Sequence, residues 1–554
     1  MTTLRIRRIA LAWPLVALLA ACAQPLARTG ESAAAHAVVR FGWTGSPDSL
    51  HPGLGVLTHS YVVYALVYDS LVQLELDGSF GPGLAESWQR SPDGLEWTFR
   101  LRPGSTFHDG APVSSRDVVF SLELYRRRAE FPFLHGYTTQ IAAVEAPDAE
   151  TVVLRLRRPV PNFESQIVFL FVLPEHVWRS VADPVAFDNA AMVGSGPFRL
   201  VEHRRNEYVR LAAHRAHPVA APRVDEVVFV TYGTLDALAQ ALRSGEVDVV
   251  RGVSPTAVRA LRRAPEVEVT SGVPLSPSTT FVEINQVDPL RCPQGGACNG
   301  HPALRDLAVR QALAHAAPKR ELLDVLLLGE GAPGRTLIPD GLVGFFHTDL
   351  VDHAFDLDRA RELLDRTGYR DRDGDGVRES PDGGRSLAFR FDFASDDPAA
   401  PRAAELLARS WARIGVRLER RAVDPNALAA VRGPSFDYDL LYWSWTSDPD
   451  PNFMLQAMTS EQIPLGGNYT GWSDPEYDEL YLRQAATLDA DLRRRLVWRM
   501  QEIALREVAY IVPFYERTVA AYRRDRFRGW RTDGAGLALE DRSSLARVEA
   551  VAAR

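Results

Sequence analysis

The sequence predicts an α/β fold with a separate β-rich subdomain in its first third. Residues 235–249 and 407–418 each combine a helix-like spacing of apolar residues, a glycine and a strand-like alternation. Helices that alternate with strands indicate mixed sheets covered by helices. Residues 95–113 instead show short strand-like segments separated by turn residues, which is typical of antiparallel pairing. The 554 residues suffice for roughly two to four domains, or for one large interleaved unit.

The first element along the chain is a signal peptide at residues 1–21. Arg5, Arg7 and Arg8 precede an apolar stretch from Ile9 to Ala20. At ~1.5 Å per helical residue, this stretch is too short to cross a ~30 Å hydrocarbon core as a permanent helix. A basic start, a short apolar body and small residues before the cleavage point are typical of a secretory signal. The sequence therefore predicts export from the cytoplasm.

The signal closes with Leu19-Ala20-Ala21-Cys22, which resembles the lipobox of bacterial lipoproteins. The resemblance implies that Cys22 becomes the first residue and is lipid-modified, so that the chain is anchored to a membrane of the cell envelope on its extracytoplasmic side. Stable anchoring takes more than one acyl chain. Residues 22–37 are mostly small or polar, and we expect a tether there. The alternative is an ordinary secretory signal with a chance cysteine.

The next elements belong to the β-rich part and to the first helix–strand unit. Residues 95–101 predict a strand, and Pro103-Gly104 and Asp109-Gly110 predict turns between short strands. Leucines from Leu235 to Leu242 share one face of a helix that Gly245 ends, and residues 247–249 alternate as a strand.

The second half repeats this organisation. Asp356 is placed to cap a helix that Gly368 closes. The apolar residues Leu387, Phe389, Phe391 and Phe393 occupy alternate positions, as one face of a half-buried strand does. A helical stripe from Leu407 to Ile414 is followed by Gly415 and a further alternating segment. These units predict the α/β part of the fold.

Composition and charge exclude some classes of protein. Hydrophobic residues make up 46% and charged residues 24% of the chain, which is typical of a globular protein. The formal net charge of −8 argues against nucleic acid as a partner, because a phosphate-binding face needs a basic excess. No stretch after the signal is apolar and long enough to span a bilayer.

Two cysteines remain once Cys22 is assigned to the anchor. Cys292 and Cys298 enclose a glycine-rich stretch, and outside the cytoplasm this pattern predicts a disulfide-closed loop. A metal-binding pair is the alternative, but no histidine or second cysteine pair stands nearby to complete four ligands.

An acidic segment fits the start of an EF-hand-like calcium loop. Asp371, Asp373 and Asp375 occupy the first, third and fifth positions, and Glu379 and Asp382 stand at the ninth and twelfth. The usual glutamate at the twelfth position is missing, and a turn rather than a clear helix follows. Structural calcium at Asp371, Asp373 and Asp375 is one interpretation, and a solvated acidic turn is the other. No other cofactor is predicted.

A family resemblance rests on motifs that follow one another in a fixed order. These are residues 84–88 (LAESW), 91–99 (SPDGLEWTF), 101–104 (LRPG), 107–113 (FHDGAPV), 117–121 (DVVFS), 194–198 (GSGPF), 244–248 (SGEVD), 309–313 (VRQAL), 468–472 (NYTGW) and 512–515 (VPFY). Together they resemble the family 5 solute-binding proteins of bacterial ABC importers, which include oligopeptide-, dipeptide- and nickel-binding lipoproteins. The resemblance covers nearly the whole mature chain. One departure is the segment 315–320, where local helix geometry is expected to differ from that of the family.

The resemblance implies a two-lobed periplasmic-binding-protein type II fold with an extra β-rich domain inserted in the N-terminal lobe. We expect lobe I at residues 38–79, 193–280 and 508–554, the inserted domain at 80–192, and lobe II at 281–507. Residues 194–198 resemble the family's crossing back between the lobes. The ligand is then enclosed as the lobes close.

The resemblance also implies a ligand site. Asp448 follows a predicted strand and matches the aspartate that accepts the α-ammonium group of a bound peptide in the family. The alternative is that Asp448 and Asp450 only begin a proline-containing turn, a role that suits acidic residues. Trp443 and Trp445 share one face of that strand and are expected to line the pocket, although filling the core of the lobe is the alternative. Trp43 and Tyr61 are candidates on the other lobe, by resemblance alone.

These features predict a monomeric solute receptor that captures a ligand, in the first place a peptide, and presents it to an ABC transporter permease. A non-peptide solute such as an opine, an oligosaccharide or a metal chelate is the alternative within the same class. An extracytoplasmic hydrolase is the alternative from another class. The sequence offers no nucleophile, zinc or phosphate-loop arrangement at a recognisable spacing, so no catalytic residue is predicted.

Overall fold

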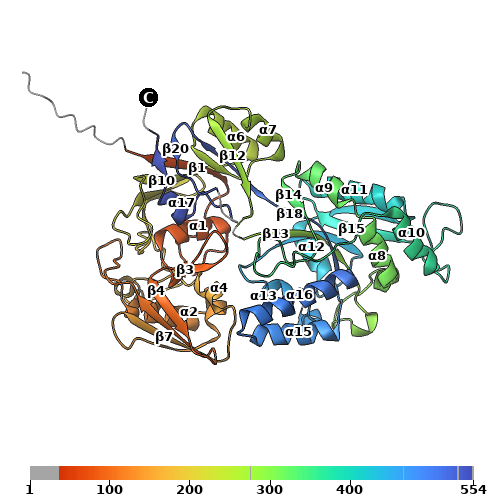
Figure 1. The fold of residues 1–554 in the computed structure, drawn as a ribbon, viewed down its shortest axis with the longest axis horizontal. Coiled ribbons are helices and arrows are strands. Elements are labelled where there is room, and N and C mark those ends of the chain that lie inside the picture. Colours follow the sequence, from red (N-terminus) through yellow and green to blue (C-terminus); the bar gives the residue numbers. More distant parts are fainter. Residues whose placement is uncertain (1–35, 132, 275, 466, 533–535, 552–554) are drawn as a thin grey trace, which may run out of the picture. The chain divides into compact units, whose positions relative to one another are not determined.

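The computed structural model describes residues 36–131, 133–274, 276–465, 467–532 and 536–551. The predicted signal peptide, Cys22 and most of the predicted tether lie outside the described residues. Residues from Ala37 onward form one compact unit, which contains two lobes, each built on its own sheet (Figure 1). No helix within the described ranges has the length and apolar character needed to cross a membrane.

Lobe I is built on a sheet of seven strands. In chain order they are β1 (Val38–Thr44), β8 (Phe198–Arg204), β9 (Tyr208–Ala213), β10 (Glu226–Tyr232), β11 (Val249–Arg251), β12 (Val267–Gly272) and β19 (Thr518–Arg523). Their spatial order is β12-β19-β11-β1-β10-β9-β8. β1 lies in the middle and pairs in parallel with β10 and β11. Its Val39 and Phe41 are buried, as expected for a central strand covered on both faces.

The helices of lobe I are α1 (Thr58–Val67), α6 (Leu235–Ser244), α7 (Pro255–Leu261) and α17 (Arg542–Leu545). The predicted helix–strand unit is confirmed. Thr234 caps α6 by accepting a hydrogen bond from the Ala237 amide at 3.1 Å, and Gly245 ends the helix with a left-handed φ of 79°. β11 starts at Val249, so only the last residue of the predicted strand at 247–249 belongs to it. A short ribbon of β20 (Phe527–Arg528) and β21 (Glu549–Ala550) closes the C-terminal part of the lobe.

The inserted domain carries an antiparallel sheet in the order β4-β5-β7-β6. Its elements are β4 (Ala85–Arg90), β5 (Glu96–Leu101), α2 (Ser115–Arg127), α3 (Leu134–Thr138), β6 (Ile141–Glu145), β7 (Thr151–Leu156), α4 (Phe163–Ile167) and α5 (Glu175–Trp178), preceded by the hairpin β2 (Val72–Leu74) and β3 (Phe80–Pro82). The predicted strand at residues 95–101 is β5. The insert is less purely β than expected, because Ser114 and Asp117 form a capping box that starts the long helix α2.

The segment 194–198 does not cross between the lobes, so that expectation is wrong. It leads from the insert into β8 and stays within lobe I. The Gly196 amide donates to the Val67 carbonyl at the end of α1, at 2.9 Å. A Cβ atom on Gly194 would lie 2.0 Å from the same carbonyl oxygen. These glycines therefore allow the backbone of this segment to lie close to the end of α1 within one lobe.

Lobe II is built on a sheet of six strands in the order β14-β18-β13-β17-β15-β16. The strands are β13 (Ser278–Ile284), β14 (Gly331–Pro333), β15 (Ala388–Ala394), β16 (Arg417–Val423), β17 (Leu440–Thr446) and β18 (Tyr510–Glu516). β13 is antiparallel to both β17 and β18, whereas β15 is parallel to both β16 and β17. Phe389, Phe391 and Phe393 of β15 are buried, which confirms the predicted alternation.

Helices surround this sheet. They are α8 (Leu307–His315), α9 (Lys319–Leu326), α10 (Leu357–Arg366), α11 (Ala400–Ala412), α12 (Pro425–Arg432), α13 (Asn452–Gln456), α14 (Gln462–Leu465), α15 (Pro475–Ala486) and α16 (Ala490–Glu507), with the 3₁₀ turns η1 (Pro289–Arg291) and η2 (Pro302–Arg305). Asp356 caps α10 as predicted, by accepting from two backbone amides. Residues 316–318 separate α8 from α9 and are not helical. They lie within the segment that departs from the family motif.

The chain passes from lobe I to lobe II between β12 and β13, and returns at Arg517 between β18 and β19. β13 starts at Ser278, close to the expected start of lobe II at residue 281. β18 lies in lobe II, although lobe I was expected to resume at residue 508. The physical reason is that β18 is almost wholly buried and hydrogen-bonds to β13 and β14. Arg517 at the return crossing pairs with Asp340, the closest nitrogen–oxygen distance being 2.6 Å.

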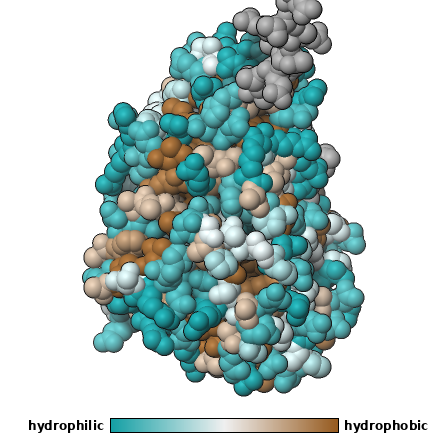
Figure 2. Space-filling view, turned by 90° about the vertical axis from the view of Figure 1, so that its left-hand side faces the viewer, coloured by the Kyte–Doolittle hydropathy of each residue, from teal (hydrophilic) through white to brown (hydrophobic). Residues whose placement is uncertain are grey.

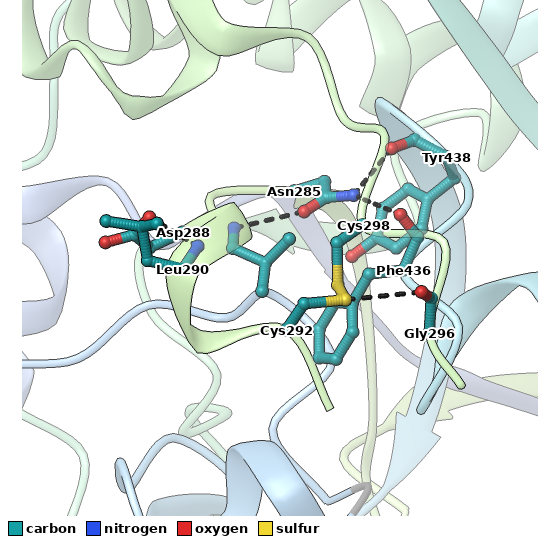
Figure 3. Close-up of a disulfide and its surroundings, with 9 residues drawn as sticks. Asn285, Asp288, Leu290, Cys292, Gly296, Cys298, Phe436 and Tyr438 are labelled. Atoms are coloured by element: carbon teal, nitrogen blue, oxygen red, sulfur yellow. Dashed lines mark hydrogen bonds between the residues drawn. A yellow bond between two sulfur atoms is a disulfide. The ribbon is translucent and has the colours of Figure 1, made fainter. Parts of the chain in front are cut away.

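The predicted disulfide is confirmed. Cys292 and Cys298 are bonded and close a small loop beside the end of β13 (Figure 3). Asn285 fixes the neighbouring backbone, because its side-chain amide donates to the carbonyls of Phe436 and Tyr438 at 2.9 and 2.7 Å.

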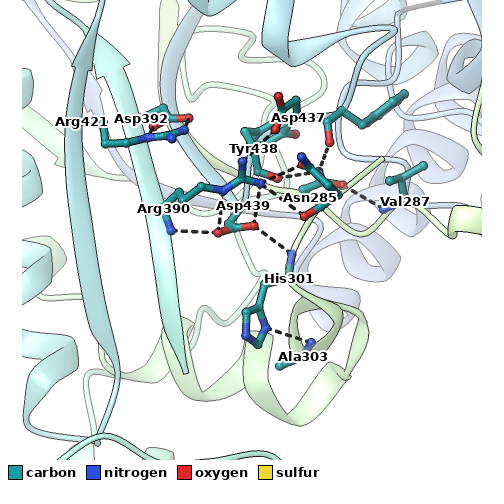
Figure 4. A network of polar contacts seen from close by, with 12 residues as sticks. Asn285, Val287, His301, Ala303, Arg390, Asp392, Arg421, Asp437, Tyr438 and Asp439 are labelled. Atoms are coloured by element: carbon teal, nitrogen blue, oxygen red, sulfur yellow. Dashed lines mark hydrogen bonds and ion pairs between the residues drawn. The ribbon is translucent and has the colours of Figure 1, made fainter. Parts of the chain in front are cut away.

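Arg390 ties this region to β15. It donates to Asp437 at 2.8 Å and to Asp439 at 3.1 Å, and Asp439 also accepts from the backbone amide of His301 (Figure 4). These buried and half-buried charges are paired, as a stable polar network requires. We interpret the network as structural support for the disulfide loop.

The outer face of lobe I carries hydrophobic residues scattered among hydrophilic ones (Figure 2). Such scatter is ordinary for a globular protein surface. The expected monomeric state stays a prediction.

Candidate functional site

Asp448 comes two residues after the end of β17. The side chain is exposed, and no hydrogen bond or ion pair to it is found among the described residues. The preceding Ser447 donates its backbone amide to the Pro277 carbonyl at 2.9 Å, which holds this segment beside the first crossing between the lobes. Desolvation by the surrounding protein, together with the charge of Asp450, raises the pKa of the Asp448 carboxyl above its ordinary value. A solvent-accessible carboxylate that protein surrounds is expected on the wall of a cleft.

Asp450, two residues later, has a structural role. Arg493 donates to both of its carboxylate oxygens, at 2.5 and 2.8 Å, and both side chains are less than 10% exposed. Asp450 also accepts from the Asn452 amide at 2.9 Å, at the start of α13. Asp450 therefore holds the segment that follows β17 against α16.

Three aromatic rings, one from α1 and two from the inserted domain, contact one another in a row. Tyr137 stacks on Phe169 with ring centroids 5.6 Å apart, and Phe169 meets the edge of Tyr61 at 6.0 Å. Burial raises the pKa of Tyr137, and the negative charge of Asp448 adds to this rise. We call Tyr137, Phe169 and Tyr61 the aromatic row.

Tyr61 and Phe169 of the aromatic row also line a cavity in lobe I. About 190 Å³ of this cavity is accessible to water, and its walls include Tyr61, Val62, Phe169, Arg251, Leu537 and Glu540. Ser276, in the first crossing between the lobes, lies on the same wall. We call this space the hinge cavity. The structure thus brings the predicted residue Tyr61 to a cavity wall beside the hinge.

The lobes face each other at a second cavity of about 340 Å³, lined by Arg90 of the insert and Asp450 of lobe II among others. Beside it, Arg90 donates to the Leu488 carbonyl at 3.3 Å across the two lobes. Arg262 and Glu330 form a further contact between the lobes at 2.5 Å. The two lobes therefore touch at more than one place.

Trp443 and Trp445 share one face of β17, as predicted. Both rings lie over the guanidinium of Arg432, at 4.8 and 5.0 Å from the ring centroids, and Arg432 in turn pairs with the buried Glu283. Trp445 also meets Phe281 at 5.0 Å. Both indoles are half-buried and pack against the core of lobe II, so part of each surface is engaged there. Their contact with a ligand stays a prediction.

Trp43 lies in the core of lobe I. It is 7% exposed, stacks on Phe229 at 4.5 Å, and donates from its indole nitrogen to Thr231 at 3.4 Å. This arrangement leaves little of the ring for a ligand, and it favours a packing role over the predicted contact.

The predicted calcium loop brings its carboxylates together. One oxygen each from Asp371, Asp373, Asp375 and Glu379 lie within 4.8 Å of one another. The same groups also accept hydrogen bonds inside the loop, and Asp371 accepts from the amides of residues 374 and 376 at 2.8 and 3.0 Å. Asp382 does not belong to this group. Both interpretations from the sequence fit this geometry, and calcium binding stays a prediction.

Comparison with known proteins identifies the family. The family model described as bacterial extracellular solute-binding proteins, family 5 Middle, matches residues 79–464. The chain belongs to this family. Members are binding proteins that act outside the cytoplasm, and the two-lobed fold agrees with this assignment.

Known relatives of this family 5 protein cover most of its length. The chain is 26% identical over 521 residues to the di/tripeptide-binding protein 1 of Pseudomonas aeruginosa, which covers 89% of this chain and 91% of that protein. A Helicobacter pylori periplasmic binding protein solved with the peptide STSA has a TM-score of 0.70 and 23% identity over 93% of this chain and 98% of that one. A Brucella suis protein solved with Fe(III)-EDTA has a TM-score of 0.79 and 21% identity over 93% and 100%.

Sequence reasoning missed two parts of the site of this family 5 protein. Tyr137 and Phe169 come from the insert, whose motifs indicated the family but no contact with the cleft. Arg251 stands three residues after the motif at 244–248, and an arginine at the end of a strand carries no distinctive signal in a chain rich in arginine. Phe169 and Arg251 meet on the wall of the hinge cavity only because the fold brings distant segments together.

Proposed function

We propose that this family 5 protein captures peptides between its two lobes and delivers them to the permease of an ABC importer. The observation that carries the proposal is the unpaired carboxylate of Asp448, at the position where the family resemblance expects the peptide ammonium group. A buried ammonium group needs a carboxylate partner, and charge-assisted hydrogen bonds of this kind are the stronger ones. Peptide binding by the Pseudomonas aeruginosa relative, as its name states, supports the same solute class.

The mechanism is a change in population between open and closed forms. A ligand that touches both lobes only in the closed form stabilises that form by its differential affinity. Asp448 on lobe II and the aromatic row on lobe I supply contacts from both sides. No bond of the ligand is broken in this function, and the protein acts without catalytic residues.

The proposed location is the outer face of a membrane in the cell envelope, with a lipid anchor on Cys22. The support is the Leu19-Ala20-Ala21-Cys22 motif and the signal before it. The lipid would hold the receptor close to its permease without a membrane-spanning helix.

A non-peptide solute is the second candidate within the same class. The Brucella suis structure with Fe(III)-EDTA has a fold similar to this one, so the fold itself is compatible with a metal chelate. A chelate that carries net negative charge would be repelled by the free carboxylate of Asp448, which favours the peptide.

Isothermal titration with di-, tri- and tetra-alanine tests the proposal on the chain that starts at Ala23. Saturable binding of at least one peptide with free termini is the expected result. Saturable binding of a chelate or an oligosaccharide, with no heat from any peptide, would overturn the peptide assignment and leave the receptor role.

A further inference from the structure

The cavity between the insert and lobe II lies beside the proposed position of the peptide ammonium group. Its volume accessible to water is about 340 Å³. Pro449, the residue directly after Asp448, is part of its wall, and the insert contributes Glu164 of α4. Pockets for small molecules usually measure ~300 to 1,000 Å³, so this space suits one side chain of a ligand better than a whole peptide. We call it the insert cavity.

Glu164 brings an unbalanced negative charge to the insert cavity. Its half-buried side chain accepts a hydrogen bond from the indole of Trp88, and it forms no ion pair within the part of the chain that the structure describes. Burial raises the pKa of the Glu164 carboxyl, as expected for a carboxylate that has lost water without gaining a cation. Asp77, a second acidic residue of the wall, is exposed and accepts from the Ser79 hydroxyl at 2.6 Å.

The other charged side chains of the wall already have partners. Arg493 and Asp450 pair with each other at 2.5 and 2.8 Å. Arg90 donates to the Leu488 carbonyl at 3.3 Å, and its guanidinium lies over the ring of Trp97 at 5.7 Å. A cation that a ligand brings into the cavity therefore meets the Glu164 carboxylate without displacing an ion pair of the protein.

The apolar part of the wall suits the stem of a long side chain. Phe80, Leu342, Phe345 and Leu488 contribute to it. Lysine and arginine bury their methylene stems along apolar surface while the charged head reaches a polar group. A charge-assisted hydrogen bond to a carboxylate is among the stronger kinds, and apolar walls strengthen it further by excluding water.

We propose that the insert cavity receives a basic side chain near the N-terminus of the ligand peptide, with Glu164 as the partner of its charged head. The inference rests on the proposed function and gives it a preference. Peptides with lysine or arginine at one of the first two positions are favoured, and other peptides still bind through Asp448. An extended chain rises ~3.3 Å per residue, so these first side chains are the ones within reach of a wall that includes Pro449.

A basic peptide of this kind would contact both halves of the molecule. Its main-chain ammonium group meets Asp448 of lobe II, and its side-chain cation meets Glu164 of the insert. Contacts that form with both sides at once stabilise the closed form.

The test compares lysine peptides with norleucine peptides, whose side chain has the same stem without the charge. Isothermal titration uses Lys-Ala-Ala and Ala-Lys-Ala with their norleucine counterparts. Wild type should bind at least one lysine peptide roughly 10- to 150-fold more tightly than its counterpart, the range expected for hydrogen bonds to a charged group. Glu164→Gln keeps an acceptor for Trp88 but loses the charge, so it should bind both members of each pair alike. Glu164→Asp should keep part of the preference.

Glu145→Gln is the matched control. Glu145 lies on β6 of the insert and pairs with Arg155 at 3.3 Å, and it is not part of the wall of the insert cavity. This variant should retain the full preference for lysine. Binding of a norleucine peptide by Glu164→Gln shows that the variant is folded.

The outcomes separate the two proposals. If wild type binds both lysine peptides no more tightly than the norleucine peptides, or if Glu164→Gln keeps the wild-type preference, the role of Glu164 is overturned while peptide binding stands. If wild type binds none of these peptides and none of the alanine peptides, the proposed function is overturned together with this inference.

Discussion

Asp448 and Asp450 are two residues apart and have opposite environments. Asp450 is buried and held through both oxygens by Arg493 at 2.5 and 2.8 Å, whereas Asp448 is exposed and has no partner among the described residues. A carboxylate that the fold leaves without a partner among the described residues is available to a ligand.

The first prediction concerns Asp448→Asn. Removing the charge should weaken a peptide with a free N-terminus by roughly 2 to 5 kcal/mol if the ion pair forms out of contact with water. An N-acetylated peptide has no ammonium group, so its affinity should hardly change. Isothermal titration of both peptides measures the difference. Asp491→Asn, a substitution on the exposed start of α16, is the control and should affect neither peptide. Equal losses for both peptides would mean that Asp448 acts structurally.

The second prediction concerns stability. Asp450→Asn leaves the buried guanidinium of Arg493 without its charged partner, and should lower the free energy of unfolding by about 3 to 5 kcal/mol. Urea denaturation measures this loss. The exposed pair of Arg494 with Asp491 offers the control, since Arg494→Gln should cost less than about 1 kcal/mol. Similar losses in the two variants would contradict the structural role of Asp450.

The third prediction concerns pH. Burial and Asp450 raise the pKa of Asp448 in the ligand-free protein, and a bound ammonium group would lower it again. Binding is therefore coupled to release of a proton at low pH. The affinity should be constant while Asp448 is ionised, and should fall as the pH drops through its raised pKa, before an ordinary exposed aspartate would be protonated. Titration across this range should show a flat profile for Asp448→Asn. A wild-type profile that is equally flat would refute the assignment.

The fourth prediction concerns the disulfide. Its loop is short, so replacing Cys292 and Cys298 by serine should lower the free energy of unfolding by only about 2 kcal/mol on the loop-entropy estimate. Ligand affinity should stay at the wild-type value, because the loop lies beside the end of β13 and away from the hinge cavity (Figure 3). Denaturation and titration of the double variant check both statements. A marked loss of affinity would indicate that the loop shapes the cleft.

The fifth prediction concerns calcium at Asp371, Asp373 and Asp375. If the loop binds the ion, adding Ca²⁺ should raise the melting temperature, because a ligand of the folded form stabilises it by mass action. Asp373→Asn should reduce this rise, whereas Asp358→Asn, on exposed α10, should not. An unchanged melting temperature at millimolar Ca²⁺ would favour the solvated acidic turn.

Local sequence signals predicted much of the fold. Gly245 and Asp356 act as expected, because a helix cap depends on the residues next to it. The disulfide between Cys292 and Cys298 was predictable from a short spacing for the same reason. β18 was assigned to the wrong lobe, since its place in the sheet depends on hydrogen bonds to β13, more than 200 residues away.

The candidate site was less predictable than the fold. Asp448 was found through a motif, but its lack of a partner, and the pairing of Asp450 with Arg493, depend on tertiary packing. Trp43 was expected to contact the ligand by resemblance alone. Nothing in the sequence indicated that Phe229 and Thr231 would enclose its ring. The placement of Arg251 on the same cavity as Tyr61 arises from three separate segments of lobe I, which no local pattern reveals.

Native mass spectrometry of the chain from Ala23, purified without denaturation, tests the central claim most directly. The account predicts bound masses that differ from one another by amino-acid residue weights, because a receptor that holds the ammonium group of a peptide accepts varied side chains. The same preparation of Asp448→Asn should carry less of this material. A single bound mass that does not correspond to any peptide would contradict the account and identify a dedicated receptor for another solute.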